Sequence, residues 1–245
     1  MKDLTIYKVK DSGSKYYTKK GGRLADLPIR CLAIGRSQSS GKSTLGINLF
    51  TRKAYYGDDF DGDNIYIFSN SLKTDDKIRR FIRFKQIPEE NCFSSYDPEI
   101  LEELYNNIHQ DYQDAIRNKE KPVNTLLYLD DVAFSGAFKN KYTIMDRLFS
   151  NARHVLCSIF CSLQSYVSCS TTLRENANAV FLFGMSNRQL EIVADDHALM
   201  PTKDFKKMFR DATKKKHSFL LINYSNPSES RYLNDKFEVI NFDET

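Results

Sequence analysis

The chain has 245 residues, of which 28% are charged and 41% are hydrophobic, and its formal net charge is +4. This length suits one large α/β domain, and no apolar run approaches the roughly 20 residues of a membrane-spanning helix. The composition is that of a globular protein and excludes a membrane-spanning one.

The first residues lack the apolar stretch of a secretory signal, and we expect the protein to stay in the cytosol of the cell that makes it. The five cysteines, an odd number, fit that reducing setting. Cys157 and Cys161 lie four apart in an apolar run, which predicts a buried, reduced pair rather than a metal site.

The first 28 residues are rich in charge and show little periodicity, so we expect an N-terminal arm over 1–28 and one domain over 29–245. The domain opens with an apolar run, a polar loop and a second apolar run, which predict a strand, a loop and a helix. The loop ends in Gly-Lys-Ser-Thr, the signature of a nucleotide-phosphate loop.

In such a loop, backbone N–H groups hold the phosphates, Lys42 reaches the β- and γ-phosphates, and the Ser43 hydroxyl binds Mg²⁺. The loop therefore predicts a nucleoside triphosphate and Mg²⁺ as cofactors, without deciding between ATP and GTP. The candidate nucleotide-binding residues are Ser37, Gln38, Ser39, Ser40, Gly41, Lys42, Ser43 and Thr44.

The spacing of this loop departs from the usual one, because Arg36 stands where the first glycine belongs and Gly35 lies one position early. Either the loop carries an extra residue, or Arg36 takes a turn position that glycine usually fills. We expect Gly35 and Arg36 together to form the entry turn.

Helices and strands then alternate. We expect strands at 65–69, 125–129, 155–163 and 180–183, and helices at 77–84, 99–118, 144–150 and 173–178. This alternation predicts a mainly parallel sheet covered on both faces. Two later runs, 219–224 and 231–233, flank a Ser-Asn-Pro-Ser turn and predict an antiparallel hairpin at the sheet edge.

A second motif lies at the end of the buried strand 125–129, where Asp130 and Asp131 follow. Ligands of open parallel sheets collect at this end of the strands. Asp130 would hold Mg²⁺ beside the Ser43 hydroxyl, and Asp131 would polarise the attacking water. Together with Lys42, the pair predicts nucleotide hydrolysis.

The strand 155–163 runs into Gln164, whose amide would lie next to the γ-phosphate if this strand is the neighbour of the Asp130 strand. An equally open reading is a solvent-facing residue that closes a strand. Arg147, Arg153 and Arg174 lie at predicted element ends, where any of them could reach a phosphate in its own subunit or in a neighbour's.

Two segments are basic: the N-terminal arm, and the stretch from Lys203 to Lys216. Either could contact nucleic-acid phosphate, although lysine runs are more often solvated surface. We favour Lys203 to Lys216 because it lies outside the nucleotide core.

Taken in order, the phosphate loop, Leu-Leu-Tyr-Leu-Asp-Asp, Asn-Ala-Arg-His-Val, Leu-Gln-Ser and Leu-Arg-Glu-Asn-Ala-Asn resemble motifs of the FtsK/HerA superfamily, specifically the viral genome-packaging ATPases of poxviruses, giant viruses and their virophages. The resemblance spans about Ile29 to Phe183. It implies a three-layer P-loop NTPase domain of the RecA-like type with an additional-strand catalytic core. By position, Arg153 resembles the family's intersubunit arginine finger, and Arg174 is the second choice.

The resemblance further implies a homo-oligomeric ring, a pentamer or hexamer, that hydrolyses ATP to move double-stranded DNA into a preformed capsid. Capsid proteins would be partners, and the location would be the host cytoplasm, a viral factory or the virion. One departure is Asp131, which stands where cellular members carry glutamate. Two alternatives stay open: a nucleotide-gated assembly scaffold with weak hydrolysis, and a small-molecule nucleotide kinase.

Overall fold

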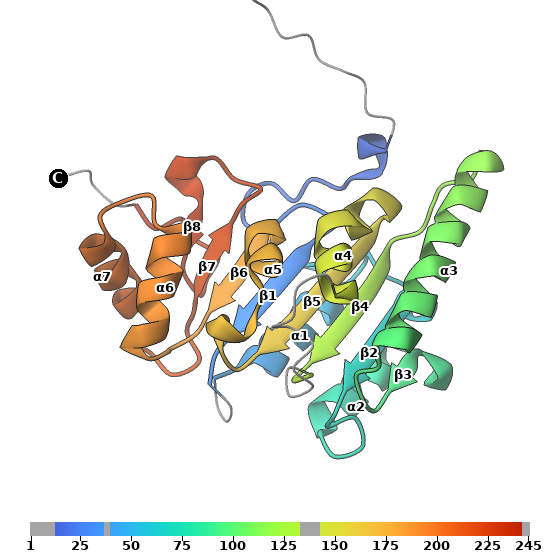
Figure 1. Ribbon diagram of the computed structural model, residues 1–245, viewed down its shortest axis with the longest axis horizontal. Coiled ribbons are helices and arrows are strands. Elements are labelled where there is room, and N and C mark those ends of the chain that lie inside the picture. The colour runs from blue at the N-terminus through green and yellow to red at the C-terminus, as the bar shows by residue number, and fades with distance from the viewer. Residues whose placement is uncertain (1–12, 37–39, 133–142, 242–245) are drawn as a thin grey trace, which may run out of the picture.

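The computed structural model describes residues 13–36, 40–132 and 143–241. In this part of the chain an eight-stranded sheet has the order β3-β2-β4-β5-β1-β6-β7-β8 (Figure 1). Its strands are β1 (Arg30–Ile34), β2 (Ile65–Ser69), β3 (Cys92–Phe93), β4 (Thr125–Asp130), β5 (Cys157–Leu163), β6 (Ala179–Leu182), β7 (Leu220–Asn223) and β8 (Tyr232–Leu233).

The first six strands are parallel, and β6, β7 and β8 pair antiparallel, so the predicted mixed sheet with a C-terminal hairpin is confirmed. Strand β5 lies between β1, which leads into the phosphate loop, and β4, which ends in Asp130. This placement is the additional-strand arrangement that the resemblance implies. We call the edge where the parallel strands end, at the bottom of Figure 1, the carboxyl edge, and the opposite one the amino edge.

Helices cover both faces of the sheet and make three layers (Figure 1). They are α1 (Lys42–Thr51), α2 (Asp76–Lys85), α3 (Pro98–Arg117), α4 (Ile144–Asn151), α5 (Thr171–Asn176), α6 (Asn187–His197) and α7 (Thr202–Ala212). Short 3-10 helices are η1 (Ser14–Tyr16), η2 (Gly62–Asn64), η3 (Glu89–Asn91), η5 (Ala152–Val155), η6 (Tyr166–Ser168) and η7 (Ser228–Ser230).

Two hydrophobic cores lie on either side of the sheet. Helices α3 to α7 contribute to one core, and α1 and α2 to the other. Alternate residues of β4 enter opposite cores, Leu127 with the first and Leu126 with the second, as expected of a strand buried on both faces. The segment before β1 also packs on the α1 side, since Leu24 and Leu27 are buried there.

Local sequence sets where the helices begin. The Asp75 and Asp97 carboxylates each accept a hydrogen bond from the first turn of α2 and α3, and Thr143 and Asp146 form a capping box at α4. Helix α1 contains Gly46 because an added Cβ there would lie 2.6 Å from the Tyr128 hydroxyl. The glycine therefore lets the phosphate-loop helix lie directly on the sheet.

Most predicted elements are present with small shifts in their ends. The strand predicted from 155 starts at Cys157, because residues 152–155 form η5 and Leu156 has a left-handed backbone with φ 55°. Helices α6 and α7 are additions that the sequence analysis did not predict. Within the described ranges, no helix has the length and apolarity needed to cross a membrane.

Candidate nucleotide-binding and hydrolysis site

Lys42 is the first residue of α1, and its side chain turns back into the phosphate loop. Its Nζ donates hydrogen bonds to the Gly35 carbonyl at 2.8 Å, the Arg36 carbonyl at 3.1 Å and the Ser40 hydroxyl at 3.2 Å. Burial lowers the pKa of Lys42, while the carboxylates of Asp131 and Asp130 oppose that shift. The ammonium is thus held at the start of a helix, where a phosphate would also be favoured.

The two glycines of the loop are needed for different reasons. A Cβ on Gly35 would lie 2.8 Å from the Phe183 Cβ, so no side chain fits there. Gly35 also continues the sheet, because its N–H donates to the Leu163 carbonyl at 3.0 Å. Gly41 has φ 104°, a left-handed conformation that glycine adopts without strain.

The close packing at Gly35 explains why the first glycine of the loop stands at this position. Gly35 is required by its close approach to Phe183, and Arg36, with an exposed side chain, follows it. Ser37, Gln38 and Ser39 lie outside the described residues, so their predicted contacts with phosphate stay predictions.

Ser43 and Asp130 meet at the carboxyl edge, as their predicted roles require. The Ser43 hydroxyl lies 3.2 Å from one Asp130 carboxylate oxygen, and the Ser162 hydroxyl of β5 donates to the other. Two oxygens about 3 Å apart match adjacent positions around Mg²⁺, which binds oxygen ligands at about 2.1 Å with octahedral geometry. Ser43 and Asp130 therefore fit Mg²⁺, which would supply charge neutralisation for the phosphates.

Asp130 is buried, and its electrostatic environment favours a nearby cation. Burial raises the pKa of its carboxyl, and the negative charges of Asp131 and Asp75 act in the same direction. Hydrogen bonds from Ser162 and Ser43 partly offset this. A divalent cation at this position would relieve the cost of a buried carboxylate.

Asp131 comes directly after β4 and is held from three sides. Its carboxylate accepts a 2.7 Å hydrogen bond from the Gln164 amide, its N–H donates to the Ser162 hydroxyl at 3.2 Å, and its carbonyl accepts from Asn70 at 3.2 Å. Its backbone has φ 54°, an uncommon conformation for a residue other than glycine. Since β5 neighbours β4, Gln164 lies beside Asp131.

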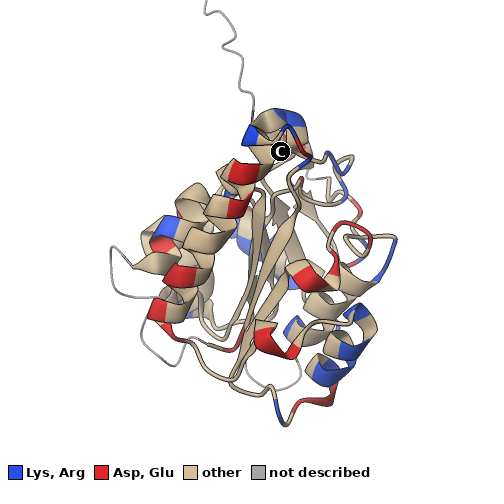
Figure 2. Ribbon diagram, turned by 90° about the vertical axis from the view of Figure 1, so that its right-hand side faces the viewer, with Lys and Arg blue, Asp and Glu red and all other residues tan. Residues whose placement is uncertain are grey.

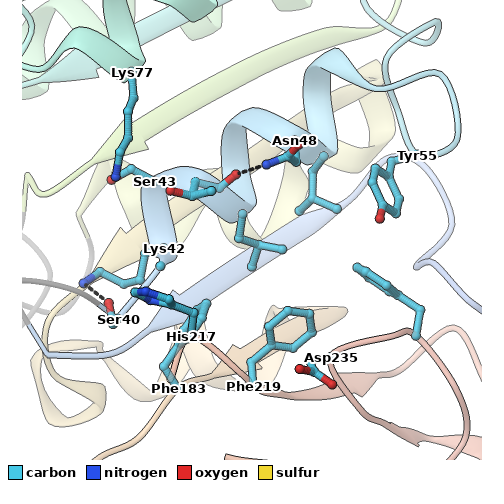
Figure 3. Close-up of a pocket in the computed structure, with 15 residues that line it drawn as sticks. Ser40, Lys42, Ser43, Asn48, Tyr55, Lys77, Phe183, His217, Phe219 and Asp235 are labelled. Atoms are coloured by element: carbon cyan, nitrogen blue, oxygen red, sulfur yellow. Dashed lines mark hydrogen bonds between the residues drawn. The ribbon is translucent and has the colours of Figure 1, made fainter. Parts of the chain in front are cut away.

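A cavity of about 600 Å³ opens next to the phosphate loop (Figure 3). Lys77 reaches toward Ser43 from α2, and His217 lies beside Gly41 from the loop before β7 (Figure 3). The cavity is lined by Ser40, Gly41, Lys42, Ser43, Thr44, Leu45, Asn48, Leu49, Tyr55, Lys77, Phe183, His217, Phe219, Asp235 and Phe237.

The three candidate arginines lie elsewhere. Arg153 is exposed in η5, just before β5, so it lies at the amino edge, one seven-residue strand or roughly 20 Å from the phosphate loop. Arg174 pairs with Asp196 at 2.5 Å, and Arg147 pairs with Glu102 at 2.6 Å. The structure therefore brings Lys42, Ser43, Asp130, Asp131 and Gln164 together, and leaves Arg153 outside its own chain's site.

Several residues of this site were not predicted from the sequence. Ser162 and Asn70 are polar residues at the ends of β5 and β2, and that position was the available signal. The aromatic residues Phe219 and Phe237 gave no signal, because only the folded hairpin returns them to the phosphate loop.

Comparison with known proteins identifies the fold. No protein-family model and no curated protein matches the chain. Among solved structures, B204, the DNA-packaging ATPase from Sulfolobus Turreted Icosahedral Virus, is similar with a TM-score of 0.56 at 17% identity, over 81% of this chain and 94% of that one. The genome packaging NTPase B204 from Sulfolobus turreted icosahedral virus 2, in complex with AMPPCP, gives 0.54 at 17% identity, over 80% and 93%.

A bacterial protein shares the fold as well. EssC (ATPases 2 and 3) from Geobacillus thermodenitrificans gives a TM-score of 0.53 at 12% identity, over 71% of this chain and 35% of that chain. At these identities the likeness concerns the fold, which is that of P-loop NTPases. The predicted fold class is confirmed, and the resemblance to the packaging ATPases is confirmed as a likeness of fold.

Proposed function

We propose that the chain is the ATPase of a viral DNA-packaging motor, which hydrolyses ATP to move double-stranded DNA into a preformed capsid. The observation that carries the proposal is the meeting of Lys42, Ser43 and Asp130 with the Asp131–Gln164 pair at one sheet edge. The fold shared with B204, a DNA-packaging ATPase, supports it.

In the proposed reaction, each residue of the site has one task. Lys42 and the N-terminus of α1 bind the β- and γ-phosphates, and Ser43 and Asp130 hold Mg²⁺. Asp131 orients the attacking water and accepts its proton. Gln164, which donates to Asp131 at 2.7 Å, holds that carboxylate and reports on the γ-phosphate.

Arg153 would act on a neighbouring subunit. Within the described residues it forms no salt bridge, and its charge helps to lower the pKa of Arg30 to about 10, after the larger effect of burial. The repulsion between these two cations at the amino edge would be relieved by an anion from another molecule. The triphosphate bound to the next subunit in a ring would be such an anion. Arg174 fits this role less well, because Asp196 already neutralises it.

The DNA surface is proposed to be basic and to lie at the carboxyl edge. Exposed Lys214, Lys215 and Lys216 precede β7, whose first residue pairs with the last residue of β6. Helix α2 adds a second basic surface, with five cations and one acid in ten residues, whereas acidic residues predominate on α3 (Figure 2). Such surfaces track backbone phosphates without reading bases.

ATP turnover of the native chain with increasing double-stranded DNA tests the proposal. A packaging motor predicts turnover that rises with DNA and loses this response at high salt, because phosphate contacts are salt-dependent. Turnover that ignores DNA in the assembled protein would contradict the motor. Nucleotide binding and assembly without turnover would support a scaffold instead, and phosphate transfer to a small acceptor would support a kinase.

A ring of five or six copies would surround the DNA, and a capsid protein would hold the ring at the entry site. The host cytoplasm or a viral factory would be the location. Cross-linking of the purified chain with and without DNA and ATP measures the ring size directly.

A further inference from the structure

The cavity continues beyond the phosphate loop along a wall of four aromatic rings (Figure 3). Phe183 and Phe219 have ring centroids 5.6 Å apart, Phe219 and Phe237 5.7 Å, and Phe237 and Tyr55 5.3 Å. The first two contacts are edge-to-face, an arrangement that aromatic pairs favour, and the third is tilted. We call these four residues the ring wall.

The ring wall starts at the phosphate loop. The Phe183 side chain packs against both Gly35 and Gly41, and its N–H donates to the Ile34 carbonyl at 2.8 Å, which extends the pairing of β6 with β1. A ligand with phosphates on the loop would therefore extend along apolar rings. Among nucleotide parts, the base is the planar and largely apolar one.

The far end of the wall is built by a turn after β8. The Asn234 side-chain oxygen accepts hydrogen bonds from the N–H groups of Lys236 at 2.9 Å and Glu238 at 3.1 Å. Phe237 is buried with φ 60°, an uncommon conformation that this turn maintains. The turn places Phe237 and Asp235 on the cavity.

Asp235 is the charged group at this end, where the Tyr55 hydroxyl also lies. Asn48 also lines the cavity, but its amide donates to the Thr44 carbonyl at 2.8 Å and its oxygen accepts from Arg52 at 3.3 Å. Within the described ranges, the Asp235 carboxylate makes no hydrogen bond or ion pair. A carboxylate accepts hydrogen bonds only, so its ligand must present a donor.

We infer that the ring wall binds the purine base of the nucleotide, and that Asp235 accepts a hydrogen bond from the 6-amino group of adenine. This inference rests on the proposed nucleotide hydrolysis and adds the recognition of the base. The cavity of about 600 Å³ is in the range of small-ligand sites. At the far end of the cavity, the apolar rings and the Asp235 carboxylate match a base edge that carries an amino donor.

The ring wall is tested by comparing ATP with inorganic tripolyphosphate, which has phosphates and no base. Phe237→Ala should weaken ATP binding about tenfold, the effect of one lost stacking contact, and leave tripolyphosphate binding unchanged. Phe93→Ala, a part-buried phenylalanine on β3 at the other end of the sheet, is the matched control. Phe237→Leu, which keeps bulk and removes the ring, should give an intermediate loss.

Asp235 is tested with three nucleotides: ATP, purine riboside triphosphate, which lacks the 6-amino group, and 2′-deoxy-ATP. The native chain should bind ATP about tenfold more tightly than purine riboside triphosphate, and Asp235→Ala should remove this preference. Asp235 is exposed, so the variant should fold. If Asp235→Ala instead removes a preference for ATP over 2′-deoxy-ATP, the carboxylate binds the ribose and the assignment is overturned.

The inference and the proposed function fail in different ways. If the native chain binds ATP no more tightly than tripolyphosphate, the base site is wrong although hydrolysis still stands. If ATP binds with the expected base preference but is never hydrolysed, the base site stands and the proposed function fails. A weakening by Phe237→Ala that is equal for both ligands also overturns the base site.

Discussion

The cation at the carboxyl edge of the sheet, Lys42, and the cation at the amino edge, Arg153, have opposite environments. At the carboxyl edge, the Lys42 ammonium is buried and makes three hydrogen bonds within its own loop. At the amino edge, Arg153 is exposed and lies near a like charge, Arg30. The first arrangement would suit a ligand bound by the same chain, and the second a ligand bound by another chain. Changing each edge separately tests this difference.

Loss of the carboxyl-edge cation should have the largest effect. Lys42→Ala removes the charge that we propose binds the β- and γ-phosphates, so we expect turnover to fall by about 10³-fold and nucleotide binding to weaken. Steady-state hydrolysis and equilibrium binding of AMPPCP measure the two effects. Lys53→Ala, an exposed lysine just after α1, is the control, and equal turnover of both variants would contradict the assignment.

Loss of the amino-edge cation should matter only between subunits. Arg153→Ala should lower turnover of the assembled protein by up to about 10³-fold, the contribution of an arginine finger. Mixing it with Lys42→Ala should restore part of the activity, since each variant supplies what the other lacks.

Arg147→Ala is the control for this experiment, because Arg147 is paired with Glu102 on the same chain. Co-assembly of the mixed subunits has to be shown by cross-linking. Mixed rings that regain no activity would place the finger elsewhere.

A smaller effect is expected for Asp131, the carboxylate that we propose orients water. Asp131→Asn keeps the shape of the side chain and removes its charge, so the chemical step should slow by about 10²-fold while AMPPCP binding persists. Single-turnover hydrolysis measures the chemical step separately from nucleotide binding. Loss of binding together with turnover would show that Asp131 positions the loop rather than the water.

The smallest effect concerns stability near the amino edge, where His197 is buried between Tyr166 and Tyr224. Burial lowers the pKa of His197 to about 4. Below pH 6.5 the unfolded chain therefore binds a proton that the folded chain does not, and stability should fall by up to about 3 kcal/mol between pH 6.5 and pH 4. Urea unfolding measures this slope.

His197→Gln should reduce the loss of stability in this pH range. The exposed His109 on α3 provides the matched control variant, His109→Gln. An unchanged slope in His197→Gln would assign the acid sensitivity to other groups.

Chemistry at the carboxyl edge was predictable because each motif lies where its strand ends. The phosphate loop follows β1, the two aspartates close β4, and Gln164 follows β5. Parallel strands end at one edge, so these residues had to come close once the sheet was parallel. That β5 lies between β1 and β4 came from the resemblance and not from periodicity.

Other features depended on contacts between distant segments. Helix α6 was not predicted, although Leu190, Val193 and Ala194 recur at helical spacing. The helix has 11 residues, and few of them are apolar, so its periodic pattern is weak. The ring wall joins Tyr55, Phe183 and Phe237, which no local pattern connects. Val155, the last residue of η5, was predicted to begin the strand, because it is as apolar as the residues of β5 that follow.

The turn after β8 has a consequence for how the chain unfolds. Its Asp235 and Phe237 line the cavity that begins at the phosphate loop, nearly 200 residues earlier. A nucleotide that binds both ends would stabilise the last hairpin by RT ln(1 + [L]/Kd), about 2.7 kcal/mol at a hundredfold excess over Kd. Amide hydrogen exchange at Phe237 would then slow with ATP and not with tripolyphosphate, so the final strands would report nucleotide occupancy.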